Sequence, residues 1–94
     1  MSNISTKRIT LIESAIRESL NPSRLEIEDE SHLHAGHAGA RSGMGHFHVT
    51  VISDKFNDLR MLQRHRLIYD SVGDLMQSDI HALRIDALTS TECI

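Results

Sequence analysis

Residues 46–51 read HFHVTV and carry a clear strand pattern. Apolar and polar side chains alternate along it, which is the two-residue period of a strand with one buried face. The apolar members are Phe47, Val49 and Val51. His46 and His48 fall on the opposite face of the strand. We therefore predict the second strand of a small sheet here, and the flanking segments determine how that sheet is built.

The segment that leads into this strand is rich in histidine and glycine. Residues 31–48 read SHLHAGHAGARSGMGHFH and contain five of the seven histidines and four of the five glycines of the chain. Imidazole is a common metal ligand at neutral pH, and glycine lets a loop bend freely. We expect function to lie in this loop, and we expect residues 32–45 to be the most mobile internal segment. The alternative is a solvated surface loop whose histidines are incidental.

Two elements precede the loop. Residues 3–20 carry apolar side chains at three- and four-residue steps, the pattern of an amphipathic helix. The apolar stripe consists of Ile9, Ile12, Ile16 and Leu20. Pro22 ends this helix, because proline disfavours helical geometry in the residue before it. Residues 25–29 then alternate apolar and acidic side chains, which predicts a first strand that pairs antiparallel with the second.

Further elements follow the second strand. A short turn around residues 55–58 precedes a predicted helix over residues 59–76, in which Gly73 is a weak point. Its apolar stripe consists of Leu62, Ile68, Val72 and Leu75, with His65 on or beside it. Alternation over residues 82–87 predicts a third strand. The last residues, 89–94, show no pattern, and we expect a flexible tail.

This order predicts one α/β (α+β) domain over residues 1–94, with elements α-β-β-α-α-β. A strand, a helical crossover and another strand normally give two parallel strands with a right-handed connection. Strands two and three should therefore be parallel in a small mixed three-stranded sheet, with the helices packed on one face. His81, at the start of the third strand, then lies at the same end of the sheet as His46. The loop can carry His34 or His37 towards His81, because extended chain spans roughly 3.3 Å per residue.

Composition narrows the function classes. The 94 residues carry ten Lys+Arg against thirteen Asp+Glu, a formal net charge of −3, which argues against nucleic-acid binding over the whole surface. Aromatic residues make up 3%, too few for base-stacking platforms. With Cys93 as the single cysteine, no apolar run of membrane-spanning length and no signal-peptide pattern, we expect a cytoplasmic protein without membrane attachment. No nucleophile elbow or carboxylate pair accompanies the serines and histidines, so we expect no enzyme.

Four stretches together give the chain a family resemblance. They are DESHLHAGH at 29–37, HFHVTVISDKF at 46–56, QRHRLIYDSVGDLM at 63–76 and IHALRIDALT at 80–89. In this order and spacing the chain resembles the BolA family, and the resemblance covers most of its length. It implies an α/β fold similar to a type II KH domain. Asp58 departs from the family pattern, because the family often has glycine at this place between the short and the long helix.

The resemblance also implies a function. BolA-like proteins are associated with monothiol glutaredoxins, with which they hold a [2Fe–2S] cluster, and the glutaredoxin side supplies its cysteine and glutathione. The resemblance implies two ligands from this chain, His81 of the IHAL motif and a loop histidine, which by alignment is His34. His37 is the second candidate for the loop ligand, and His46 is a candidate for orienting a ligand without binding the metal itself. The implied protein is a non-enzymatic adaptor in iron–sulfur cluster trafficking or iron and redox regulation, and we expect no cofactor in the isolated chain.

A second hypothesis comes from the same resemblance, because some family members are described as DNA-binding transcriptional regulators. A basic cluster is available for phosphate contacts. It consists of Lys55, Arg60, Arg64 and Arg66. KH domains clamp nucleic acid with a GxxG loop between their two helices, whereas residues 57–60 contain no glycine. His65, between two of the arginines, is either a contact residue or a packed structural residue.

A third hypothesis is a mononuclear zinc or nickel site. His46 and His48 share one strand face and could chelate a metal together with a loop histidine. Alternatively, the loop could hold the ion by itself. The loop histidines in question are His32, His34 and His37.

Overall fold

The computed structural model describes residues 4–31 and 44–92. Its elements in chain order are α1 (Ile4–Leu20), β1 (Arg24–Asp29), β2 (Gly45–Ile52), the 3-10 helix η3 (Asp54–Phe56), α2 (Met61–Val72), α3 (Leu75–Ser78) and β3 (Ile80–Leu88). The sequence predicts this order, with η3 as the expected short turn, except that α2 and α3 were expected as one helix. Cys93 and the loop histidines His32, His34 and His37 lie outside the described residues, as does most of the segment expected to be mobile. Among residues 4–31 and 44–92, the helices lack the length and the apolar character that a membrane-spanning helix needs.

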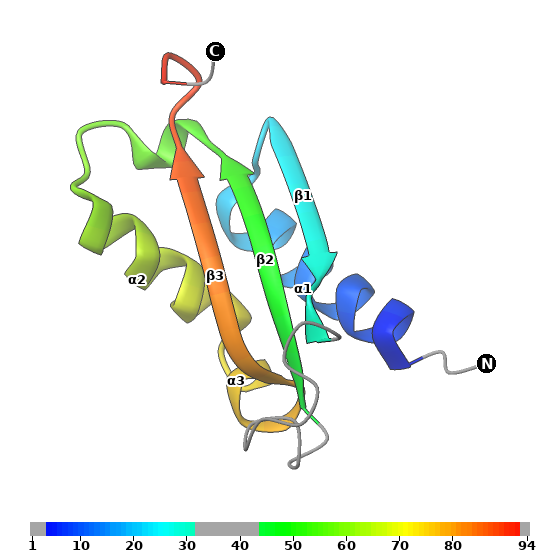
Figure 1. Cartoon of the computed structure of the whole chain (residues 1–94). Coiled ribbons are helices and arrows are strands. Elements are labelled where there is room, and N and C mark those ends of the chain that lie inside the picture. The colour runs from blue at the N-terminus through cyan, green and yellow to red at the C-terminus, as the bar shows by residue number, and fades with distance from the viewer. Residues whose placement is uncertain (1–3, 32–43, 93–94) are drawn as a thin grey trace.

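The three strands form one mixed sheet in the order β1-β2-β3. β1 pairs antiparallel with β2, so that Ile27 lies opposite Val49. β2 pairs parallel with β3, so that Phe47 lies opposite Leu83. Both pairings confirm the predicted topology. The long helices α1 and α2 cover one face of the sheet, and no described helix lies on the other, which we call the open face (Figure 1).

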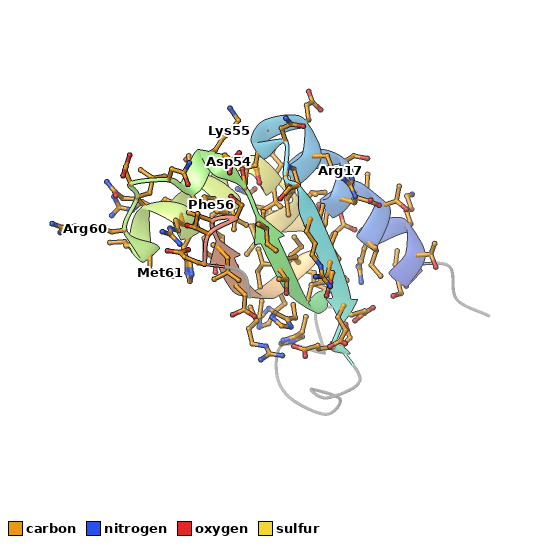
Figure 2. The ribbon with its side chains drawn as sticks, turned by 90° about the horizontal axis from the view of Figure 1, so that it is seen from above. Arg17, Asp54, Lys55, Phe56, Arg60 and Met61 are labelled. Carbon is orange, nitrogen blue, oxygen red and sulfur yellow. The ribbon has the colours of Figure 1, made fainter. Side chains whose placement is uncertain are left out.

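The hydrophobic core fills the space between the sheet and the two long helices. β2 contributes Phe47, Val49 and Val51, each at most 1% exposed, which confirms the predicted buried face. The helices contribute Ile12, Ile16 and Leu20 from α1 and Ile68 and Val72 from α2. Phe56 of η3 is fully buried and closes the core at the end of the sheet where β2 and β3 finish (Figure 2).

The predicted helix over residues 59–76 is two helices, and its buried face differs from the prediction. α2 ends at Val72, because Gly73 adopts a positive φ of 48° and turns the chain before α3. Leu62, expected in the core stripe, is 64% exposed. Arg64 is buried instead, because it lies about two turns before Val72 on the side of α2 that faces the core.

Asp58 lies in the turn between η3 and α2 and adopts a left-handed conformation, with φ 66°. Aspartate tolerates this region better than most L-residues, but only glycine enters it without steric cost. This is the position at which the family resemblance leads us to expect glycine. Asp58 therefore adopts here the left-handed conformation that glycine favours, at the cost of strain in its backbone.

The outer edge of β3 is covered by side chains of α2. Tyr69 Oη donates to the carbonyl of Leu83 (3.4 Å), and Arg64 Nη1 donates to the carbonyl of Ala87 (3.1 Å). These contacts occupy edge carbonyls that would otherwise be open to pairing with another chain. Arg64 also binds Glu92, so the segment expected to be a flexible tail has fixed contacts as far as Glu92.

Candidate functional site

His46 and His81 come together at one end of the sheet, although 35 residues separate them in the sequence. Their ring centroids are 5.1 Å apart, and the rings are tilted by 52°. Because β2 and β3 are parallel, both strands begin at this end, which is also where β1 finishes (Figure 1). The predicted placement of His81 beside His46 is therefore confirmed.

A β-bulge determines how His81 is presented. Gly45 pairs with Ile80, but the next residue, His46, pairs with Ala82. His81 is the extra residue on β3 and lies opposite no residue of β2. An extra residue of this kind re-aims the side chain and increases the local twist. Ile80 is fully buried and His81 is exposed, so the bulge places the imidazole at the surface directly after a core residue.

The backbone of His46 is hydrogen-bonded to the two residues that follow β1, and His46 is only 8% exposed. Its carbonyl accepts a hydrogen bond from the Glu30 N–H (2.7 Å), and its N–H donates to Ser31 Oγ (3.1 Å). Ser31 is the last described residue before the histidine-rich segment, and Met44 is the first after it. The two ends of that segment are thus joined next to the His46–His81 pair.

The start of β3 is fixed by contacts with both β2 and α1. The carbonyl of Asp79 accepts a hydrogen bond from the Gly45 N–H (2.9 Å), and its carboxylate binds Arg8 of α1 at 3.1 Å. The hydrogen bond from Ser78, together with Arg8, holds the pKa of Asp79 below its ordinary value. An ion-paired Asp79 therefore anchors the backbone two residues before His81.

His34, the predicted loop ligand, and the alternatives His32 and His37 lie outside the described residues, so their roles stay predictions. The second histidine of the strand, His48, has different neighbours from His46. Its Nε2 lies 2.6 Å from Asp86 Oδ2, and its Nδ1 lies 3.3 Å from Arg84 Nη2.

The basic cluster predicted from the sequence is not one continuous surface. Arg64 is 7% exposed and its guanidinium is paired with Glu92, so including it among the exposed cations was wrong. Lys55, Arg60 and Arg66 are exposed. Lys55 and Arg60 extend from the molecule at separate points (Figure 2). The sequence did contain a signal for Arg64, namely its four-residue step to the core position Ile68.

Comparison with known proteins agrees with this geometry. A family model described as "BolA-like protein" matches residues 16–92. The chain is 38% identical over 81 residues to the DNA-binding transcriptional regulator BolA of Escherichia coli (strain K12), a match that covers 86% of this chain and 74% of that protein. It is 42% identical over 86 residues to SufE-like protein 1, chloroplastic/mitochondrial, of Arabidopsis thaliana, but spans only 23% of that protein's length.

Solved structures share the whole arrangement of elements. BolA1 from Arabidopsis thaliana superposes with a TM-score of 0.79 at 30% identity, covering 93% of this chain and 96% of that one. The BolA domain of SufE1 from Arabidopsis thaliana superposes with a TM-score of 0.77 at 40% identity, covering 88% and 92%. The resemblance seen in the sequence motifs is confirmed over nearly the full length of the chain.

Proposed function

Because the chain belongs to the BolA family, we propose that it is a non-enzymatic adaptor that binds a monothiol glutaredoxin and shares a [2Fe–2S] cluster with it. Its role would be iron–sulfur cluster trafficking or iron and redox regulation. The observation that carries the proposal is the exposed imidazole of His81, packed against His46 at 5.1 Å where β1 ends and β2 begins.

The residues at this end of the sheet fit such a cluster. Within residues 4–31 and 44–92, the His81 side chain makes no hydrogen bond, so its ring nitrogens could serve a metal. Imidazole is an established ligand of one iron in [2Fe–2S] centres, where it raises the reduction potential relative to thiolate. His34 follows Ser31 by three residues, which span at most about 10 Å of extended chain. His34 is therefore the proposed second ligand, with His37 as the alternative.

The remaining residues of the site position these ligands. His46 packs against the His81 ring and restricts its orientation, as groups around metal-bound histidines commonly do. The paired Asp79 and the bulge fix the backbone from which His81 projects. The glutaredoxin would supply its cysteine and glutathione, so the isolated chain provides only half of the ligands.

The direct test mixes the protein with a monothiol glutaredoxin that carries its cluster. We expect a change in the visible absorption and circular dichroism of the cluster, together with co-elution of the two proteins. His81→Ala should abolish the spectral change, and His34→Ala should weaken or abolish it. His65→Ala, a half-buried histidine on α2, is the matched control and should leave the spectrum as in the wild type. An unaltered spectrum with no co-elution would overturn the proposal.

A second candidate function is DNA binding, supported by the described role of the Escherichia coli relative and by three exposed cations. Lys55, Arg60 and Arg66 form no ion pair within the described residues. Duplex binding through them should weaken steeply with salt, because each phosphate contact releases counterions. The double variant Arg60→Glu with Arg66→Glu should lose binding, whereas Arg17→Glu, on α1, should not. Binding that persists in the double variant would exclude this surface.

A further inference from the structure

A second cluster of ligand-type side chains lies on the open face of the sheet. Glu28 of β1 lies directly opposite His48 of β2 in the register of the sheet. Glu30 follows β1, and its N–H bonds the backbone of β2 at 2.7 Å. One ligand atom from each of these three side chains lies within 4.8 Å of the other two. Glu28 and His48 also line a hollow of about 470 Å³ on this face, together with Thr50 and Arg84.

The orientation of His48 is determined by two residues of β3. Arg84 Nη2 can only donate, and it lies 3.3 Å from His48 Nδ1, so this nitrogen carries the lone pair. The other nitrogen, Nε2, then carries the proton and donates to Asp86 Oδ2 at 2.6 Å. A carboxylate that accepts from one ring nitrogen while the other faces a metal is the usual arrangement around metal-bound histidine. Asp86 therefore presents the His48 lone pair towards the side of Glu30.

A cation already occupies this place in the structure. The guanidinium of Arg84 contacts both oxygens of Glu30, at 2.7 Å from Nη2 to Oε2 and 3.2 Å from Nε to Oε1. The same Nη2 is the atom that approaches His48 Nδ1. Glu30 is only 8% exposed, and a carboxylate removed from water needs a cationic partner. The Arg84 side chain itself is 65% exposed and can swing away into solvent.

We propose that Glu28, Glu30 and His48 form a binding site for a divalent transition-metal ion, in which Asp86 orients His48 and Arg84 is the competing internal cation. Two carboxylates and an imidazole suit Zn²⁺, Mn²⁺ or Fe²⁺. Metal–ligand bonds of about 2.1 Å put tetrahedral ligand atoms about 3.4 Å apart. Reaching that spacing from 4.8 Å needs only side-chain rotation, which the exposed Glu28 can supply. The site requires neither His81 nor a glutaredoxin, so it stands independently of the proposed function.

The test must separate this site from the histidine-rich loop. We would use the full chain with His32, His34 and His37 all replaced by Asn, and titrate it with ZnCl₂ at pH 7 in a calorimeter. One Zn²⁺ should bind per chain. Glu30→Gln and His48→Gln in this background should each weaken binding by about tenfold or more. Glu26→Gln, on the same strand and face, is the control and should change the affinity less than about twofold.

Two further variants test the roles that we assign to Asp86 and Arg84 of β3. Asp86→Asn should weaken Zn²⁺ binding by about tenfold, because an amide cannot hold the same His48 tautomer as firmly. Arg84→Met should strengthen Zn²⁺ binding by about twofold to fivefold, because it removes the competing cation from an exposed pair. A merely structural Arg84 would not give a gain in affinity.

A readout that needs no substitution among Glu28, Glu30, His48, Arg84 and Asp86 covers the case in which one of those variants fails to fold. Substoichiometric Mn²⁺ added to the loop-substituted chain should broaden backbone amide NMR signals of residues 27–30 and 47–49 first. Broadening centred on residues 80–82, or no Zn²⁺ binding in the loop-substituted chain, would overturn the proposal. Unchanged Zn²⁺ affinity in both Glu30→Gln and His48→Gln would overturn it as well.

Discussion

Arg64 of α2 and Glu92, four residues beyond β3, form a two-pronged ion pair. Arg64 Nη1 lies 2.6 Å from Glu92 Oε1, and Nη2 lies 3.1 Å from Oε2. The same guanidinium donates to the carbonyls of Leu59 (3.0 Å) and Ala87 (3.1 Å). One side chain thus joins the start of α2, the end of β3 and the segment after it. A residue expected to contact phosphate is instead a buried structural connection.

Arg64→Met should lower the free energy of unfolding by roughly 2 kcal/mol, because it leaves buried acceptors without donors while keeping most of the volume. Urea denaturation at pH 7 measures this. The control is Arg66→Met on the same helix, whose side chain is exposed and whose effect should stay within about 0.5 kcal/mol. Equal losses in the two variants would contradict the assigned role of Arg64.

The Arg64–Glu92 pair makes the free energy of unfolding depend on pH in the acidic range. Hydrogen bonds from Arg64, then from the Thr89 N–H, lower the pKa of Glu92 from 4.5 to about 2. A depressed carboxyl pKa gives stability that is fully present above the unfolded-state value and is lost as pH falls through the folded-state value. The stability difference between wild type and Glu92→Gln should therefore shrink between about pH 4.5 and pH 2. Thermal denaturation at a series of pH values follows it, and a constant difference would refute the depressed pKa.

Asp58→Gly should stabilise the fold by up to about 1 kcal/mol. The left-handed φ of 66° strains the Asp58 backbone. The free energy of this strain exceeds the free-energy cost of the extra conformational entropy that glycine gives the unfolded chain. Asn57→Gly is the matched control, since Asn57 has a negative φ of −57° and glycine there should only destabilise. The melting temperatures of the two variants should move in opposite directions, and a shared direction would argue against strain at Asp58.

Gly45→Ala should destabilise the protein by about 1–3 kcal/mol, because overpacking a filled core forces neighbours to move. A Cβ at Gly45 would lie 2.6 Å from Phe47 Cε2 and 3.1 Å from Ser31 Oγ. Adding Phe47→Leu should offset part of the loss, and the interaction energy from a double-mutant cycle should be favourable. Strictly additive losses in denaturant titrations would show that the clash is not the cause.

His81→Ala should leave the free energy of unfolding within about 0.5 kcal/mol of wild type, since its side chain is exposed and outside the core. His46→Ala should cost more, about 1–2 kcal/mol, because His46 is 8% exposed. Chemical denaturation of both variants compares their free energies of unfolding, and a larger loss for His46→Ala would show that His46 supports the fold whereas His81 does not. A large loss for His81→Ala would mean that its ring supports the fold.

Much of the fold follows from local pattern. The alternation over residues 46–51 predicts β2 and its buried face, and the stripe in α1 predicts the core positions Ile12 and Ile16. The parallel pairing of β2 with β3 follows from the helical crossover between them. That pairing was sufficient to place His81 beside His46, because parallel strands begin at the same end of a sheet.

The local sequence pattern could not predict which side chains of α2 become buried through contacts with distant segments. Leu62 and Arg64 both fit a helical stripe, and the choice depended on carbonyls and a carboxylate that β3 and Glu92 bring to Arg64. The bulge that exposes His81 arises from the register between two strands, which no single segment encodes.

Hydrophobic period and chain connectivity are thus sufficient to predict the strands, the sheet topology and the end of the sheet at which His46 and His81 meet, because these features depend on local sequence. The burial of Arg64 and the convergence of Glu28, Glu30 and His48 follow from tertiary packing instead. Hydrogen bonds and charge pairs between distant segments depend on angstrom-scale distances, and those distances exist only once the strands and helices have packed.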